Sequence, residues 1–168
     1  MACARRVLVL AASALVLPLA SCGFALRQAP DFGFHSIYLA LPAGSALGVE
    51  LRRQLEGTGS IQVITDAARR ADADVVLESA GEQRERAVVS LTATGEVREL
   101  QLRLRFAFRV RTPAGRELLA QSEILRQVDQ SYSESAALSK EQEALMLYQD
   151  MQSDIVQQVM RRLATIKT

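Results

Sequence analysis

A run of alternating residues at 97–111, in which period 2 is kept over eleven positions from Leu100 on, constrains the fold of this 168-residue chain more than any other feature. One set of alternate positions is apolar and comprises Leu100, Leu102, Leu104, Phe106, Phe108 and Val110. The intervening set comprises Gln101, Arg103, Arg105, Ala107, Arg109 and Arg111. Successive side chains of a strand point to opposite faces of its sheet. The run therefore predicts one long, half-buried strand with an open face that carries arginines.

Five shorter segments also have strand patterns, at residues 36–41, 61–65, 75–79, 87–91 and 117–129. The charged stretch at residues 81–86 is expected to form a bulge or a turn between two of them. Thr94-Gly95 and Pro113-Ala114-Gly115 have the residue types of turns. On the last strand, one face is expected to carry Leu118, Ala120, Ile124 and Val128.

Two further segments repeat apolar residues at helical spacing. The first follows Ser45, a residue type that caps helices, and its apolar face consists of Leu47, Leu51 and Leu55. The second covers residues 140–166, and its apolar stripe consists of Tyr148, Met151, Ile155, Val159 and Leu163. Ser139 and Gln142 have the spacing of a capping box at its start. Together these elements predict an α+β fold, with a mostly antiparallel four- to five-stranded sheet and two helices packed on one face.

The N-terminus has the pattern of a lipoprotein signal. Arg5 and Arg6 precede an apolar run over residues 7–20, which is shorter than the roughly 20 residues of a membrane span. The run ends in Leu19-Ala20-Ser21-Cys22, which has the residue types of a lipobox. We expect residues 1–21 to be a signal peptide and Cys22 to carry a diacylglyceryl group. The alternative is an ordinary signal peptide followed by a cysteine present by chance.

After cleavage we expect a tether over residues 22–35 and a single α+β domain over residues 36–168. Phe24, Phe32 and Phe34 of the tether are apolar, so the segment is a candidate to pack on the domain or on a partner. The residue after Cys22 is glycine, not the aspartate that commonly retains lipoproteins in the inner membrane. This favours a lipid-anchored location at the outer membrane.

Charge and motifs exclude several functions. The chain has 20 Lys and Arg against 19 Asp and Glu, and loss of Arg5 and Arg6 with the signal leaves 18 against 19, or about −1. That balance predicts no nucleic-acid partner. The chain lacks a P-loop, a G-x-G-x-x-G motif and zinc-ligand spacing, and we interpret its single histidine, His35, as a bystander. We predict a protein that is not an enzyme and has no metal or cofactor, apart from the covalent lipid on Cys22.

The strongest candidate binding surface is the set of arginines on the open face of the alternating run, namely Arg103, Arg105, Arg109 and Arg111. Arginine pairs in a bidentate manner with phosphate and carboxylate, so this arginine stripe is a candidate surface for a polyanion or an acidic partner. The alternative is a solvated strand face that resists edge aggregation. Lys140, at the predicted start of the last helix, either joins the stripe or is ordinary helix surface.

The order of these patterns resembles a known family. Cys22-Gly23-Phe24-Ala25-Leu26-Arg27 is similar to the mature start of lipopolysaccharide-assembly lipoproteins of the LptE family. The layout that follows is also similar and includes Leu51-Arg52-Arg53-Gln54-Leu55, Ala137-Leu138-Ser139-Lys140-Glu141 and Arg161-Arg162-Leu163. The resemblance covers essentially the whole mature chain.

This resemblance implies an outer-membrane lipoprotein that sits as a plug inside the β-barrel LptD. The pair would assist the assembly and insertion of lipopolysaccharide into the outer leaflet, and lipopolysaccharide itself is an expected ligand. Lys140 matches a lysine position of the family, where basic residues are implicated in that binding. Residues 91–94 lack the arginine that some members carry at the hairpin tip, which increases the weight on the arginine stripe.

Two other functions stay open. A stand-alone periplasmic lipid-binding protein needs a large apolar cavity, of which the sequence gives no sign. A structural envelope lipoprotein that binds peptidoglycan needs an aromatic platform, and the tyrosines available for one are Tyr38, Tyr132 and Tyr148.

Overall fold

The structure is a computed structural model that describes residues 30–167. In chain order its elements are β1 (Ser36–Ala40), α2 (Ala46–Gly57), β2 (Gln62–Ile64), the 3-10 helix η2 (Ala67–Asp72), β3 (Val75–Leu91), β4 (Val97–Arg111), β5 (Glu117–Ser131), the 3-10 helix η3 (Glu134–Ala136) and α3 (Ala137–Leu163). The predicted signal peptide at residues 1–21, Cys22 and the first part of the predicted tether lie outside the described residues.

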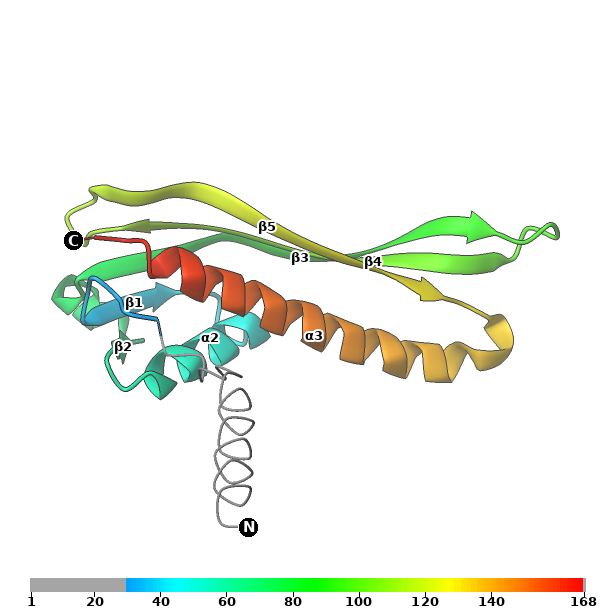
Figure 1. The fold of residues 1–168 in the computed structure, drawn as a ribbon, viewed down its shortest axis with the longest axis horizontal. Coiled ribbons are helices and arrows are strands. Elements are labelled where there is room, and N and C mark those ends of the chain that lie inside the picture. The colour runs from blue at the N-terminus through cyan, green and yellow to red at the C-terminus, as the bar shows by residue number, and fades with distance from the viewer. Residues whose placement is uncertain (1–29, 168) are drawn as a thin grey trace, which may run out of the picture.

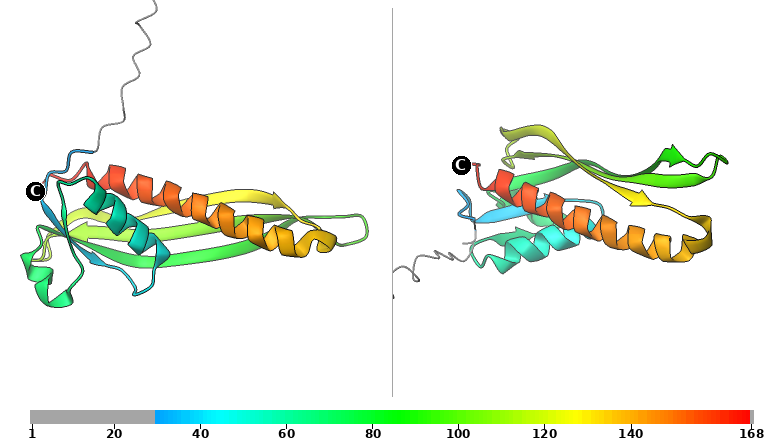
Figure 2. Two further views of the ribbon diagram at one scale, coloured as in Figure 1. Left: turned by 90° about the horizontal axis from the view of Figure 1, so that it is seen from below. Right: turned by 45° about the vertical axis from the view of Figure 1, so that its right-hand side comes forward.

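The five strands form one mixed sheet in the order β2-β1-β3-β4-β5. β1 pairs in parallel with β2 and β3, whereas the long strands β3, β4 and β5 are antiparallel. Helices α2 and α3 cover the same face of this sheet, and α3 runs along the long strands (Figures 1 and 2). The predicted α+β class and the two helices on one face are confirmed.

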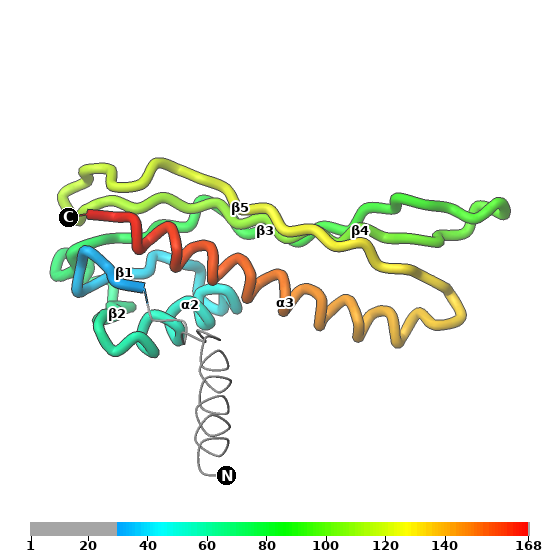
Figure 3. The backbone as a smooth tube through the Cα atoms, in the orientation of Figure 1, coloured from blue at the N-terminus to red at the C-terminus, as the bar shows by residue number. Residues whose placement is uncertain are grey.

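The molecule is elongated and its two ends are built differently (Figure 3). The short strands, α2 and η2 gather at one end, which we call the broad end. From there β3 and β4 run to the opposite end, where their hairpin extends past the start of α3. We call residues 88–99 the hairpin arm.

The even-numbered side chains of β4 form the centre of the core, as the alternation predicted. Residues Leu102 to Val110 of this set are fully buried, and Phe106 stacks on Phe108 with ring centroids 5.5 Å apart. The predicted apolar stripes of both helices pack against them and are also buried. Burial of one such side chain stabilises the fold by about 1.5–3 kcal/mol, so the packed helix faces fix both helices to the sheet.

The start of α2 also agrees with the sequence prediction. The Ser45 hydroxyl oxygen accepts a hydrogen bond from the Gly48 backbone N–H at 3.0 Å, which caps the helix. The same hydroxyl donates to Glu82 of β3 at 2.8 Å. This residue therefore both starts the helix and ties it to the sheet.

The described end of the predicted tether is part of the packed structure. Phe32 and Phe34 are buried in the main core, with ring centroids 5.4 Å apart. Gly33, between them, forms a parallel bridge with Lys167, so the two ends of the described chain lie side by side. A Cβ at this position would lie 2.6 Å from the Ile166 carbonyl oxygen, so the close approach requires glycine.

The prediction of two separate strands at residues 75–79 and 87–91 is wrong. The segments 75–79 and 87–91 belong to a single strand, β3, and the charged stretch between them holds no turn. An irregularity between Ser79 and Gly81 is the expected bulge. Beyond the bulge, the positions of β3 that face the helices carry charged side chains, and these form hydrogen bonds with α3. Arg84 donates to Gln152, and Arg86 forms two hydrogen bonds with Glu141.

Two local predictions are also corrected. α3 begins at Ala137, and Ser139 lies inside its first turn, where the hydroxyl donates to the Ala136 carbonyl at 2.8 Å; the predicted capping box is therefore wrong. Ala120 is exposed, because the register of β5 shifts between the pairs Phe108–Ser122 and Val110–Leu119 and this changes which residues face the core.

Candidate functional site

The arginine stripe projects from the outer face of the sheet, opposite the helices. Residues paired across neighbouring strands share a face, so the register shows what surrounds it. Acidic residues of β3 and β5 occupy the same outer face, namely Glu78, Glu85, Glu117, Glu123 and Asp129. The outer face around the stripe is therefore nearly neutral in net charge. The sequence of β4 alone does not predict this, because the acidic residues lie on β3 and β5.

The half of the stripe nearer the hairpin arm is matched by local partners. Arg105 Nη1 donates to Glu123 Oε1 at 2.8 Å. Arg103 Nε donates to Gln101 Oε1 at 2.7 Å, and the amide of Gln101 donates in turn to Asp129 at 2.9 Å. Such pairs on an exposed strand contribute little to stability, about 0–1 kcal/mol each.

The half of the stripe at the broad end is different, because three guanidinium groups converge on one carboxylate. Glu78 Oε2 accepts from Arg109 Nε at 2.7 Å and from Arg111 Nη2 at 2.6 Å, and its Oε1 accepts from Arg70 Nη2 at 2.7 Å. Burial opposes the ionisation of Glu78, but the hydrogen bonds from Arg109 and Arg111 outweigh it and hold the pKa of this carboxyl below its ordinary value of 4.5. Arg70, which completes the cluster, lies outside the alternating run, so the strand pattern did not predict it.

Lys140 lies at the arm end of the molecule and does not join the stripe. Its ammonium donates to Ser131 at 3.0 Å and to Glu143 at 2.8 Å. Its backbone carbonyl accepts from the buried Gln130 amide at 2.8 Å, which fixes the first turn of α3 against the end of β5. The five predicted side chains thus form three separate groups.

A surface cavity of about 360 Å³ lies at the same end, between the hairpin and the loop that precedes α3. Its lining includes Thr92, Arg98, Tyr132 and Ser135. Large apolar side chains are exposed nearby in sequence on both elements, with Val88 54 % and Leu91 56 % exposed on the hairpin and Leu138 77 % exposed on α3. The arm end therefore combines apolar side chains with charges of both signs at the surface, since Glu96 and Glu134 also line the cavity and Lys140 pairs with Glu143. Arg98 was missed because its place on β4 precedes the alternation used for the prediction.

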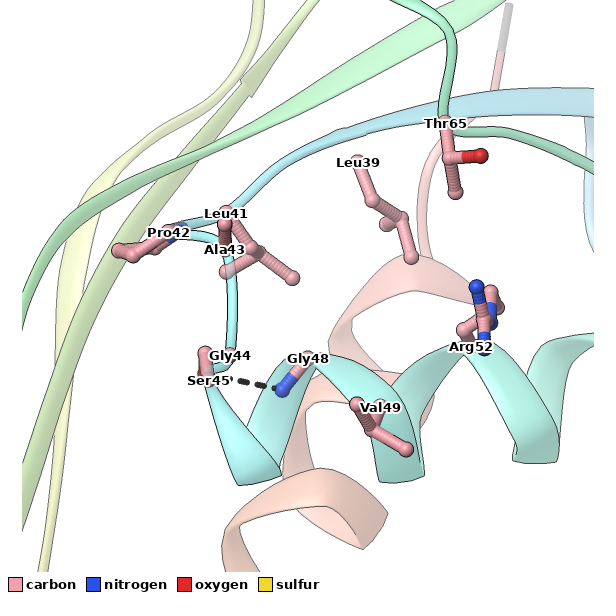
Figure 4. Close-up of a pocket in the computed structure, with 10 residues that line it drawn as sticks. All are labelled: Leu39, Leu41, Pro42, Ala43, Gly44, Ser45, Gly48, Val49, Arg52 and Thr65. Carbon is pink, nitrogen blue, oxygen red and sulfur yellow. Dashed lines mark hydrogen bonds between the residues drawn. The ribbon is translucent and has the colours of Figure 1, made fainter.

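A second cavity, of about 260 Å³, opens between β1 and α2 (Figure 4). Leu39, Leu41 and Val49 give it an apolar wall, and Arg52 lies at its rim. A Cβ on Gly48 would lie 3.1 Å from the Leu41 side chain, so the glycine allows the helix to pack this closely. The cavity has no cluster of polar groups that could hold a specific ligand by hydrogen bonds.

Among residues 30–167, no group of three or more His, Cys, Asp or Glu side chains is placed to hold a metal ion. No helix in this part of the chain combines the length and the apolar character needed to cross a membrane.

The chain belongs to the LptE family of lipopolysaccharide-assembly proteins, because the family model described as "LptE: Lipopolysaccharide-assembly" matches residues 34–163. The resemblance predicted from the sequence is thereby confirmed. Comparison with curated protein sequences gave no match.

Solved structures agree with this assignment. An uncharacterized lipoprotein B from Nitrosomonas europaea is 31 % identical, with 84 % of this chain and 90 % of that chain covered and a TM-score of 0.72. The rare lipoprotein B from Shewanella oneidensis is 26 % identical over 78 % of this chain and 95 % of that chain, with a TM-score of 0.66. A minor lipoprotein from Acinetobacter baumannii, at 20 % identity, 80 % and 94 % coverage and a TM-score of 0.64, shows the same fold.

Proposed function

We propose that this protein is anchored in the outer membrane through a lipid on Cys22 and partners an LptD-like β-barrel as a plug. In this role it assists the assembly and insertion of lipopolysaccharide into the outer leaflet. Membership of a lipopolysaccharide-assembly family supports a role in lipopolysaccharide assembly. The elongated shape and the mixed-charge outer face in the half nearer the hairpin arm suit the polar interior of a barrel.

The observation that carries lipopolysaccharide binding is the composition of the arm end. The lipid part of lipopolysaccharide presents phosphates beside acyl chains, so a complementary surface needs cations next to apolar groups. Lys140 and Arg98 supply charge at this end, and Val88, Leu91 and Leu138 supply exposed apolar area.

The test of the partnership is purification of the tagged full-length protein from its native outer membrane in mild detergent, with mass spectrometry of the eluate. We expect one large β-barrel protein in equal molar amount. Recovery of lipid without a barrel would support a stand-alone lipid-binding protein instead. Sedimentation with the cell wall would support a structural envelope lipoprotein.

The test of the lipopolysaccharide contact uses the two lysines of the described chain. We expect Lys140→Gln to weaken lipopolysaccharide binding by the purified protein about fivefold, the effect of losing one charge at an anionic surface. Lys167→Gln removes the same charge at the broad end and should leave binding unchanged. Equal loss in both variants would show that total charge, and not the arm end, governs binding.

A further inference from the structure

The cluster formed by Arg70, Arg109 and Arg111 around Glu78, which we call the arginine cluster, carries more positive charge than its carboxylate can neutralise. Three guanidinium groups contact one carboxylate, which accepts four hydrogen bonds from them. Three of these bonds fall on Oε2 and one on Oε1, so most of the accepting capacity of the carboxylate is used within the cluster. Taken by itself, the cluster has two positive charges in excess, and Glu117, in register with Arg111, is an acidic residue on the neighbouring strand.

The three arginines also keep unused donors. Each guanidinium has five N–H groups, and these side chains use one, one and two of them on Glu78. Arg70 and Arg109 are 46 % and 43 % exposed, whereas Glu78 is only 14 % exposed. The carboxylate is thus covered by the arginines, whose free N–H groups are open to an anion from solvent.

The support beneath the arginine cluster is ordered. Ile64, Ala73 and Val76 are buried but stand apart from the main core, because η2 covers the outer face of the sheet at the broad end. The Arg70 guanidinium lies over the Tyr38 ring at 5.9 Å from its centroid. The cluster is therefore held in place on a small apolar base, which lowers the conformational entropy that an anion would have to remove on binding.

The cluster lies beside the point where the chain enters the fold. Asp74 accepts the backbone N–H groups of His35 and Ser36 at 2.8 and 2.9 Å. Glu78 follows four residues later on β3, or about 13 Å along the strand at about 3.3 Å per residue. Cys22 is eight residues before the first described residue, Pro30, so an anchor there lies at most about 28 Å from it.

We propose that the arginine cluster binds the phosphate groups of phospholipids in the leaflet that holds the lipid anchor. This inference rests on the anchored location given above as the proposed function. Arginine pairs with phosphate through two parallel N–H donors, and the excess charge matches an anionic surface. Contact at this site orients the broad end toward the membrane and directs the hairpin arm away from it.

The test uses the mature chain, residues 22–168, with Cys22→Ser, so that neither the predicted signal peptide nor a lipid masks the contact, and flotation with vesicles at low ionic strength. We expect it to bind vesicles of equal parts phosphatidylglycerol and phosphatidylcholine and not those of phosphatidylcholine alone. Arg70→Gln with Arg109→Gln should lower the partition coefficient about 25-fold, about fivefold for each arginine. Arg111 stays in place to pair with Glu78, which protects the fold.

The matched control is Arg103→Gln with Arg105→Gln, which removes the same charge from the arm half of β4 and should change binding less than twofold. Equal losses in the two double variants, or equal binding to both kinds of vesicle, would overturn the proposal. The anchor is tested separately by the mass of the N-terminal peptide of the wild-type protein. A lipid on Cys22 without an effect of the Arg70 and Arg109 changes would refute the phosphate site and leave the anchor standing.

Discussion

The broad end and the arm end of this molecule use the same sheet in opposite ways. At the broad end the sheet is covered on one face by helices and on the other by η2, and side chains such as Leu51 and Val76 are fully buried. At the arm end, Val88, Leu91 and Leu138 are more than half exposed. We infer that the broad end supplies most of the stability, whereas the arm end keeps apolar groups available for other molecules.

The largest expected contrast comes from two leucines in helices. Leu51 of α2 is fully buried and Leu145 of α3 is 57 % exposed. We expect Leu51→Ala to lower the free energy of unfolding by about 3 kcal/mol, because it leaves a cavity in the core. Leu145→Ala should change it by less than about 0.5 kcal/mol. Urea denaturation of both variants measures the contrast, and similar losses would contradict the division between the two ends.

A smaller loss of stability is expected when Asp74 of the broad end is changed. We call the hydrogen bonds from the His35 and Ser36 backbone N–H groups to its carboxylate the Asp74 clamp. Asp74→Asn removes the charge that accepts the N–H groups of His35 and Ser36, and we expect a loss of about 1 kcal/mol in the free energy of unfolding. Asp72→Asn is the control, because that carboxylate pairs only with the neighbouring, exposed Arg69. An equal effect of the two changes would show that Asp74 does not hold the segment that leads into β1.

The clamp also gives a pH dependence. The hydrogen bond from the His35 backbone N–H, together with those from Ser36, holds the pKa of Asp74 below its ordinary value of 3.8, against the opposing effect of burial. A carboxyl with a lowered pKa in the folded state stabilises the fold fully above pH 3.8, and this contribution is lost as the pH falls through the folded-state pKa. Unfolding measured across acidic pH should therefore show a smaller acid destabilisation for Asp74→Asn than for wild type.

Tyr148 of α3 contacts β3 between the two ends. Removal of its hydroxyl should lower the free energy of unfolding about as much as the change at Asp74. Its hydroxyl donates to the Glu85 carbonyl at 2.7 Å, and Arg84 lies over its ring at 5.3 Å. Tyr148→Phe should lower the free energy of unfolding by about 1 kcal/mol, because the carbonyl is left without this donor. Tyr132→Phe is the control. If thermal unfolding shows no difference between the two, α3 does not depend on this bond.

The smallest effect on stability is expected at the hairpin arm. Val88→Ser should change the free energy of unfolding by less than about 0.5 kcal/mol, since the side chain is more than half exposed. The same change should weaken lipopolysaccharide binding about threefold through loss of apolar contact. A stability loss like that of Leu51→Ala would show that the arm is part of the core.

The sequence predicted those parts of the fold in which one face is apolar. β4 agrees with its predicted bounds and α2 starts after Ser45 as predicted, because alternation or helical spacing continues along each of them. β3 was divided in two because its helix-facing positions carry Glu82, Arg84 and Arg86, which are satisfied by Ser45, Gln152 and Glu141. Such partners come from elements far apart in the chain, and no local pattern reveals them.

The sequence predicted which arginines form the candidate surface. It did not predict that they fall into two groups with different acidic partners. The alternation of β4 identified its four arginines, yet their acidic neighbours depend on the register with β3 and β5. Arg70 joins the cluster from η2, eight residues before Glu78, with which it pairs. Sequence alone therefore could not distinguish the neutralised half of the stripe from the half with excess charge.

The bridge between Gly33 and Lys167 has a consequence for the order of folding. In the exported chain that the signal predicts, the N-terminal strand reaches the periplasm first and α3 last. Until α3 arrives, the apolar face of β4 lacks the helix that covers it, so a partly translocated chain exposes aggregation-prone surface. Contacts between residues so distant in sequence also form slowly. For a chain exported as the signal predicts, completion of this fold thus waits until α3 has followed the strands across the membrane.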